Sequence, residues 1–494
     1  MNDDVITGIM AAAGREPART AIVDGRGREV AYGELARRVN AVRDELAGQP
    51  GDGVLFAVRP GVDAVALALG AVAAGGTLVL ADPGLAPEVL AARMAATRPK
   101  WVVAESLLYT LSGPLKALAR RRGLLLPNLR DPLPGRSVRH LYTGPWLPGV
   151  PRGALRLARI LRTPRLPAPD AFAATADQPA AVIFTSGTTA RPRGVVHTRG
   201  SLAAGLALFR SAFPLGPGDV VHTDQLMLGL PALLAGATWS LPGGGDLAAE
   251  LAARGATHTF AVPVHLDRLL RRTPTLPATL RYLLLGAAPA PPAVLRRALE
   301  AGPEVLSVYA MTEALPIAIA SAREKLAQAE GDLLGAPLPG VGVRIADDGE
   351  LFVSGPHLAQ RYLGEDPLEE IATGDLVRVE DGRLVLLGRK KDMILRDGVN
   401  IYPGLYESSV AALPGVAEAA IVGLADPETG DEEVVLAVIP ADGYDESLVR
   451  KALPAIVDAA ALPDRIEPLD AFPRSGRADK LDRAALRDLV AHRD

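Results

Sequence analysis

Short apolar runs alternate with segments of helical periodicity along two parts of the chain, residues 1 to about 110 and 181 to about 387. Runs such as Thr20–Asp24 and Val54–Val58 predict buried strands. Apolar side chains recur at helical spacing between them, at Leu35, Val39, Val42 and Leu46. Strands that alternate with helices are typical of a mainly parallel sheet covered by helices, so the pattern predicts an α/β fold.

The run Ala64–Ala81 carries no charge, and it just reaches the length of a membrane-spanning helix. It is rich in alanine and glycine, and the pair Gly75-Gly76 divides it. A buried helix followed by a buried strand explains this composition better than a single span. We therefore expect no transmembrane segment.

A basic segment, residues 111 to 170, interrupts the alternating pattern. Twelve Lys and Arg residues lie between Leu115 and Arg165, and Asp131 is the single acid among them. The piece Arg152–Arg162 predicts a short basic amphipathic helix. The segment is either a solvated insertion whose arginine stems cover apolar surface, or a docking surface for an acidic carrier protein, a pathway enzyme or an anionic membrane surface.

Composition narrows the class of protein. The chain has 494 residues, which is enough for two or three domains. Half of the residues are apolar. A net charge of −4 predicts no general affinity for nucleic acid. Cysteine is absent, which excludes disulfides, thiolate metal sites and a cysteine nucleophile. The acidic start MNDDVITGIM has no signal-peptide pattern, so we expect a cytoplasmic enzyme.

The stretch Ala181–Val196, AVIFTSGTTARPRGVV, predicts a strand that ends in a loop of small hydroxylated residues flanked by arginines. Glycine allows several backbone N–H groups to point at one anion, and hydroxyls and arginines add donors and charge. The loop suits a polyphosphate, although it is not a Walker loop. A surface turn between two strands is the alternative.

Three further loops are predicted to follow strand ends. The strand His258–Pro263 leads to a helix, the strand Tyr282–Leu285 ends in Gly286–Pro289, and the strand Val305–Tyr309 ends in Ala310–Glu313. Ligands of parallel sheets sit beyond the carboxyl ends of the strands. We therefore expect these loops to meet at one crevice.

These motifs resemble the adenylate-forming superfamily of acyl-CoA synthetases, luciferases and peptide-synthetase adenylation domains. The loop is similar to TSGTTGxPKGV, with Ala190 for a glycine and Arg193 for the lysine. The segment GAAP, which begins at Gly286, is similar to the family motif GGAP, and YAMTE, which begins at Tyr309, is similar to YGxTE. The family motif TGD is present at Thr373–Asp375. The resemblance implies an ATP site at Thr185, Ser186, Gly187, Thr188, Thr189, Gly286, Ala287, Ala288, Pro289, Tyr309, Ala310, Met311, Thr312, Asp375 and Arg389.

The same resemblance implies roles for single residues. Tyr309 would stack on adenine, Asp375 would bind the ribose hydroxyls, and Glu313 would hold Mg²⁺. Near the end, PRSGRADKLDR is similar to PRTxxGKxDR, which makes Lys480 the lysine that meets the acyl phosphate. The implied catalytic residues are Lys480, Thr312, Glu313 and Arg193.

The resemblance also implies two domains. An N-terminal domain, residues 1–388, would contain layered, mainly parallel sheets with helices, and a small α+β lid would occupy 389–494. The segment GRKKDMILRDG would form the hinge near Lys391, and Gly398 would lie where the pantetheine arm of CoA passes.

The predicted reaction is ATP-dependent conversion of an aliphatic acid to acyl-AMP, followed by transfer to CoA. The predicted acyl pocket is apolar and contains Leu228, Gly229, Val262 and Pro263. TEALPIA from Thr312 resembles the β-lactone synthetases of bacterial olefin pathways, in which the hydroxyl of an adenylated β-hydroxy acid closes a ring without CoA. Activation of an amino acid, with Asp224 on its amine, and a nucleotide-binding protein without catalysis are further alternatives.

Overall fold

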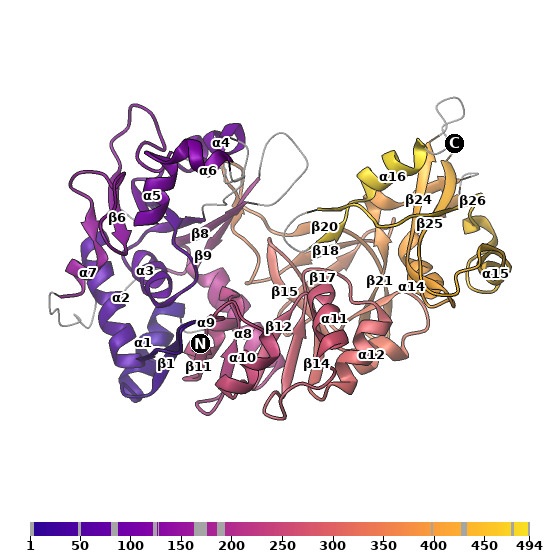
Figure 1. The fold of residues 1–494 in the computed structure, drawn as a ribbon, viewed down its shortest axis with the longest axis horizontal. Coiled ribbons are helices and arrows are strands. Elements are labelled where there is room, and N and C mark those ends of the chain that lie inside the picture. The colour runs from indigo at the N-terminus through magenta and orange to yellow at the C-terminus, as the bar shows by residue number, and fades with distance from the viewer. Residues whose placement is uncertain are drawn as a thin grey trace. The chain divides into compact units, whose positions relative to one another are not determined.

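The computed structural model describes residues 4–47, 51–80, 87–121, 126, 128–162, 175–184, 193–396, 399–425, 432–475 and 479–492. The chain forms two compact units (Figure 1). The first contains Met1–Thr259, Thr312–Leu315 and Gly355–Glu369, and the second contains Phe260–Met311, Pro316–Ser354 and Glu370–Asp494. The chain therefore passes between the units several times, and the domain boundary at residue 388 stays a prediction.

An eight-stranded sheet lies in the first unit, in the order β19-β9-β8-β4-β3-β5-β6-β7. Neighbours from β8 to β7 are parallel, and only β9 and β19 add antiparallel edges. The strands are β3 (Gly53–Ala57), β4 (Thr77–Leu80), β5 (Trp101–Glu105), β6 (Arg139–Thr143), β7 (Leu155–Arg156), β8 (Pro179–Phe184), β9 (Gly194–Thr198) and β19 (Arg361–Tyr362). This sheet confirms the predicted parallel α/β pattern.

A second group of strands in the first unit runs in the order β10-β11-β1-β2. These strands are β1 (Thr20–Val23), β2 (Glu29–Ala31), β10 (Val220–His222) and β11 (Thr238–Ser240), and the start of β12 (His258–Ala261) pairs with β10. The helices of this unit are α1 (Val5–Arg15), α2 (Tyr32–Leu46), α3 (Val62–Ala73), α4 (Pro87–Thr97), α5 (Ser106–Ser112), α6 (Lys116–Arg121), α7 (Leu157–Ile160), α8 (Arg199–Ala212), α9 (Leu226–Leu234) and α10 (Leu247–Arg254).

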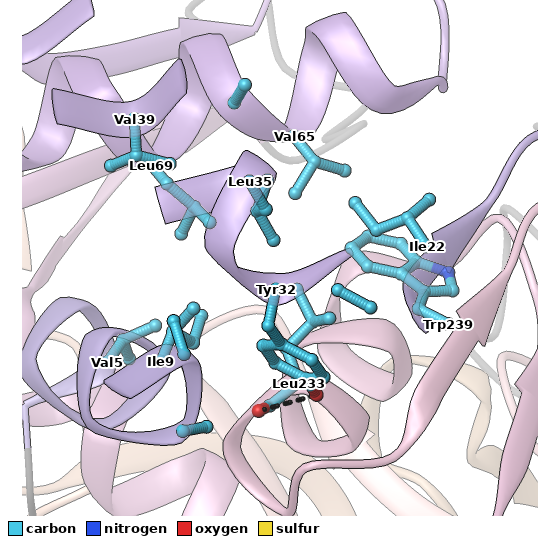
Figure 2. Packing of buried hydrophobic residues seen from close by; sticks show 14 of the residues in the cluster. Val5, Ile9, Ile22, Tyr32, Leu35, Val39, Val65, Leu69, Leu233 and Trp239 are labelled. Atoms are coloured by element: carbon cyan, nitrogen blue, oxygen red, sulfur yellow. Dashed lines mark hydrogen bonds between the residues drawn. The ribbon is translucent and has the colours of Figure 1, made fainter. Parts of the chain in front are cut away.

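Helices α1, α2 and α3 bury their apolar faces in one core with strands β1 and β11 (Figure 2). Trp239 lies at its edge with 1% of its surface exposed, and its indole N–H donates to the Thr223 carbonyl at 2.8 Å. Tyr32, at the start of α2, donates its hydroxyl to Leu233 of α9 at 3.0 Å. Both polar groups are thus satisfied, which removes the penalty of burying them. The four positions predicted for α2 are all buried.

The described part of the uncharged run, residues 64–80, contains most of α3 and all of β4, and the glycine pair lies between them as predicted. Within the described ranges, no helix is long and apolar enough to cross a bilayer.

The basic segment differs from its prediction. The piece Arg152–Arg162 does not form one amphipathic helix, because it begins with a turn and continues in the short strand β7 and a single helical turn, α7. Leu157 and Ile160 pack into a core with Val54 and Trp101. The apolar positions are therefore buried by the sheet edge, and pairing of β7 with β6 replaces the first helical turn.

The second unit contains two parallel strands, an antiparallel sheet and a C-terminal part. Strands β13 (Tyr282–Leu285) and β14 (Glu304–Met311) are parallel. An antiparallel sheet, which periodicity alone did not predict, has the order β16-β21-β20-β18-β17. Its strands are β16 (Asp332–Gly335), β17 (Gly342–Ile345), β18 (Glu350–Ser354), β20 (Ile371–Glu380) and β21 (Arg383–Arg389). The adjoining elements are α11 (Pro263–Arg272), α12 (Pro292–Glu300), β15 (Ala314–Ser321, whose first two residues belong to the first unit) and α13 (Ala322–Ala327).

The C-terminal part has the predicted α+β character. It contains a three-stranded sheet of β24 (Val416–Ala425), β25 (Glu432–Pro440) and β26 (Arg465–Pro468). An apolar cluster packs on each face of this sheet: Val434 belongs to one cluster and its neighbour Val435 to the other, because successive side chains of a strand point to opposite faces. The remaining elements are the 3-10 turns at Lys390–Asp392, Pro403–Leu405, Leu453–Ala455 and Ala459–Ala461, with β22 (Ile394–Arg396), β23 (Val399–Ile401), α14 (Glu407–Ala411), α15 (Glu446–Ala452), β27 (Arg474–Ser475), β28 (Lys480–Leu481) and α16 (Arg483–Ala491).

Candidate active site

The loop Gly286–Pro289 and the end of β14 share one edge of the second unit. Strands β13 and β14 are parallel in register, with Leu285 opposite Ser307. A Cβ added at Gly286 would lie 3.1 Å from the Phe260 ring and 3.7 Å from the Val308 carbonyl. Ala287 has φ +68°, a conformation that glycine adopts far more easily. The turn therefore has the backbone shape of a glycine motif although alanine occupies it.

Tyr309, Asp375 and Arg389 form one polar group in the second unit. The Tyr309 hydroxyl donates to Asp375 Oδ2 at 2.7 Å, and Arg389 Nε lies 3.1 Å from Asp375 Oδ1. Asp375 and Arg389 are cross-strand partners on β20 and β21. Burial first, and then the Asp375 charge, raise the pKa of Tyr309, so its phenol stays protonated and donates. Asp375 is 6% exposed and offers its carboxylate from the sheet.

The charges of Asp375 and Arg389 affect the pKa of Lys480. It lies on β28, directly after Asp479, whose φ is +50°. Partial desolvation, followed by the nearby charges of Arg389 and Lys391, lowers the pKa of Lys480, while Asp375 opposes the shift. The residue as a whole is exposed. Lys391 lies in the 3-10 turn after β21, and its role as a hinge stays a prediction.

Glu313 lies in the first unit, in the turn between β14 and β15. It is 8% exposed, and its Oε1 accepts the Tyr362 hydroxyl at 2.9 Å. Its backbone carbonyl accepts from Ala359 N at 2.7 Å. Among the described residues, no group of three or more His, Asp or Glu could hold a metal. A single carboxylate fits Mg²⁺ that is bound together with substrate phosphates.

Arg193 lies directly before β9 in the same unit. Its guanidinium carbon is 3.6 Å from the centroid of the Tyr362 ring, and Nη2 is 3.0 Å from Glu365 Oε2. About half of each charged side chain is exposed, so this ion pair is weak and exchangeable. The arginine is therefore held in place without being neutralised permanently.

Thr312 is fixed through its backbone. The ring N–H of His197, at Nε2, donates to the Thr312 carbonyl at 2.7 Å, and Nδ1 lies 3.2 Å from Ser201 Oγ. Burial lowers the pKa of His197 and favours the neutral ring. This histidine on β9 thus positions the turn that contains Thr312 and Glu313.

The predicted acyl-pocket residues lie on two elements. Leu228 and Gly229 are buried on α9, while Val262 and Pro263 lie where β12 gives way to α11. A Cβ at Gly229 would overlap the indole ring of Trp239, so this glycine permits close packing of α9 on the core. Contact of these four predicted pocket residues with the substrate stays a prediction.

Some predicted residues lie outside the described part of the chain. They are Thr185, Ser186, Gly187, Thr188, Thr189 and Gly398. Ala288, Pro289, Ala310 and Met311 are described, on the Gly286 loop and on β14.

Sequence reasoning missed Tyr362, Glu365 and His197. Tyr362 follows Glu313 by 49 residues, and only the pairing of β19 with β9 brings it near Arg193. His197 lies on β9, the strand that follows the glycine loop, and its contact with Thr312 appears only in the structure.

His357 is a buried histidine whose protonation should make the folded protein sensitive to acid. It is 1% exposed, and neither ring nitrogen has a hydrogen-bond partner among the described residues. Burial, and then the nearby His197, lower its pKa to about 4. The unfolded chain, with a pKa near 6.5, takes up the proton first as the pH falls. The stability that His357 contributes is therefore present above pH 6.5 and lost between pH 6.5 and 4.

The free energy of unfolding should fall between pH 7.5 and pH 4.5 in both proteins, and we expect the fall to be about 2 kcal/mol smaller in His357→Asn than in the wild type. The measurement is urea unfolding at both pH values. His492→Asn, at an exposed position, is the matched control. Equal losses in wild type and His357→Asn would show that His357 does not drive the acid sensitivity.

Two family models match the chain. The one described as AMP-binding enzyme matches residues 9–363, and the one described as AMP-binding enzyme C-terminal domain matches 405–478. The feruloyl-CoA synthase of an Amycolatopsis species is 31% identical over 366 residues, 65% of this chain and 74% of that protein. The 2-succinylbenzoate–CoA ligase of Bacillus cereus is 31% identical over 342 residues, 63% of this chain and 70% of that protein.

Solved structures agree in fold. The amide bond synthetase McbA from Marinactinospora thermotolerans superposes with a TM-score of 0.81 at 25% identity, over 98% of this chain and 99% of that chain. ATP-bound MatB from Rhodopseudomonas palustris gives 0.79 at 25% identity, over 100% and 99%. Fold and motifs together define an adenylate-forming enzyme. The chain belongs to the AMP-binding enzyme family and is of the acyl-CoA synthetase type.

Proposed function

We propose that the chain activates an aliphatic carboxylic acid with ATP, releases pyrophosphate and transfers the acyl group from acyl-AMP to CoA. The observation that carries the proposal is the polar group of Tyr309, Asp375 and Arg389, whose charges act on Lys480. An aromatic ring suits a base, and a carboxylate suits ribose hydroxyls. The CoA ligases among the relatives support the same reaction class.

The chemistry requires positive charge more than a protein nucleophile. The substrate carboxylate attacks the α-phosphate of ATP, and pyrophosphate leaves with the bonding electrons. Both reactants are anionic, and their repulsion is large where water is excluded. Lys480 and Arg193 would offset it, so the protein acts by positioning and electrostatics. Mg²⁺, held by Glu313 with the phosphates, would supply further charge neutralisation.

The aliphatic preference rests on helix α9. Its residues Leu226–Leu234 carry no charge, and Leu228 is 5% exposed. Two of the relatives are named for feruloyl and 2-succinylbenzoate groups, so aryl acids belong in any substrate panel.

The test is to incubate the protein with ATP, Mg²⁺ and aliphatic, aryl and β-hydroxy acids, with and without CoA, and to identify products by mass. We expect AMP, pyrophosphate and acyl-CoA, with aliphatic acids preferred. ADP and phosphate from a good acid would contradict the proposal. A β-lactone formed without CoA would instead assign the β-lactone synthetase reaction.

We also propose that the basic segment docks on an anionic membrane surface, where an aliphatic acid would partition. Six of its described arginines form no ion pair with another described residue, namely Arg121, Arg130, Arg136, Arg152, Arg159 and Arg162. Trp146 is 63% exposed in the β6–β7 loop, and Leu115, directly before α6, and Leu118 on α6 are also exposed. Thr110 on α5 donates its hydroxyl to Pro148 at 2.6 Å, which places the loop beside the α5–α6 turn. Arginine with exposed tryptophan suits a lipid headgroup region.

Cosedimentation with vesicles tests this proposal. We expect binding to vesicles rich in phosphatidylserine, weaker binding at high salt, and little binding to neutral vesicles. Arg152→Gln with Arg159→Gln should reduce it, while Arg450→Gln on α15 is the control. Binding to an acidic carrier protein in place of vesicles would assign the alternative partner.

A further inference from the structure

Arg193 stands where the related motif has a lysine, and its surroundings differ from those of a free phosphate-binding cation. The guanidinium is stacked 3.6 Å from the centre of the Tyr362 ring. Its Nη2 atom also lies 3.0 Å from Glu365 Oε2. Two side chains of the short segment 362–365 thus hold the guanidinium: Tyr362 contacts its face, and Glu365 contacts its edge.

The same tyrosine contacts the carboxylate expected to hold the metal. Tyr362 donates its hydroxyl to Glu313 Oε1 at 2.9 Å. Its ring is buried, with 5% of the residue exposed, so it has little freedom to turn. One side chain therefore presents its ring face to Arg193 and its hydroxyl to Glu313.

The backbone fixes this arrangement. Strand β19 pairs with β9, with Tyr362 opposite Val195, and Leu363 N donates to the Gly194 carbonyl at 2.7 Å. Ala359 N donates to the Glu313 carbonyl, also at 2.7 Å. Residues 359–363 thus bind both the turn that bears Glu313 and the strand that follows Arg193.

Arginine and lysine differ in this environment. A planar guanidinium stacks its flat face on an aromatic ring and keeps the N–H groups of its edge for an anion, whereas an ammonium has no flat face and turns some of its three donors toward the ring. The weak, half-exposed pair with Glu365 can exchange for a phosphate without loss of the stack.

We propose that Tyr362 is a positioning residue that holds Arg193 and Glu313 in one arrangement, and that this site is therefore built for a guanidinium at position 193. The inference rests on the proposed function, because it assigns the two held groups to the phosphates and metal of ATP. Arg193 and Mg²⁺-bound Glu313 are then set relative to each other by one rigid ring.

Binding of ATP with Mg²⁺ in the absence of an acid, measured by calorimetry, tests the inference. Arg193→Lys keeps the charge but loses the stack, so we expect the Kd for ATP to rise about tenfold. Tyr362→Phe keeps the ring and loses the hydroxyl, so we expect the Mg²⁺ concentration for half-maximal binding to rise about tenfold.

Double substitutions separate positioning from general damage. Arg193→Lys should weaken binding a further tenfold or so in Tyr362→Phe, but by less than about threefold in Tyr362→Leu, where the ring is already absent. Arg210→Lys and Tyr142→Phe, at an exposed arginine and a buried tyrosine of the same unit, are the matched controls. If Tyr362→Leu does not fold, the shifts in Arg193→Lys and Tyr362→Phe decide alone.

Wild-type affinity in Arg193→Lys, or an unchanged Mg²⁺ requirement in Tyr362→Phe, would overturn the inference and leave the proposed function standing. A wild-type chain that binds no ATP with Mg²⁺ would overturn both.

Discussion

Replacing Lys480 by alanine is expected to slow acyl-AMP formation by at least about 100-fold, because one preorganised charge at the reacting phosphate is lost. The nearby cations Arg389 and Lys391 show that this region gathers positive charge, which a carboxylate approaching an anionic phosphate requires. Formation of acyl-CoA from supplied acyl-AMP should change little. The two half-reactions are measured as pyrophosphate exchange and as thioester formation.

The control for Lys480→Ala is Lys451→Ala, an exposed lysine on α15 of the same unit. It should leave both half-reactions as in the wild type. A normal rate of pyrophosphate exchange in Lys480→Ala would move the role to another cation.

Asp375→Asn is expected to raise the KM for ATP about 100-fold. The substitution replaces a carboxylate that accepts from Tyr309 and pairs with Arg389 by an amide whose NH₂ group cannot accept. If the carboxylate binds the ribose, the wild type should prefer ATP over 2′-deoxy-ATP, and the variant should lose most of that preference. Steady-state kinetics with both nucleotides measure this effect.

Asp381→Asn is a matched control, because Asp381 lies at the exposed turn between the same two strands, β20 and β21. It should behave as the wild type. An Asp375→Asn variant that retains its preference for the 2′-hydroxyl would place the ribose elsewhere.

Strands and helices with strong periodicity could be predicted from the sequence. The helix through Leu35, Val39, Val42 and Leu46 and the helix–strand division of Ala64–Ala81 follow from local pattern alone. The group of Tyr309, Asp375 and Arg389 was anticipated as motifs, and the structure adds the hydrogen bond and ion pair that join them.

Features that depend on distant pairing could not be predicted. Residues Arg152–Arg162 have an amphipathic pattern, but pairing of β7 with β6 and burial of Leu157 and Ile160 overrode helix formation. Tyr362 carries no local signal, because its partners Arg193 and Glu313 lie far away in the sequence. The left-handed backbone at Ala287 and Asp479 likewise appears only in the structure, at positions where the related motifs have glycine.

The interleaving of the two units bears on how the protein is made. The first unit ends its longest stretch at Thr259, but it also needs residues 312–315 and 355–369. A ribosome adds roughly 5 to 20 residues per second, so the 110 residues from 260 to 369 take roughly 5 to 20 s. During that interval Arg193 has been synthesised and Tyr362 has not. Nascent chains therefore carry an open strand edge at β9 until β19 has been synthesised.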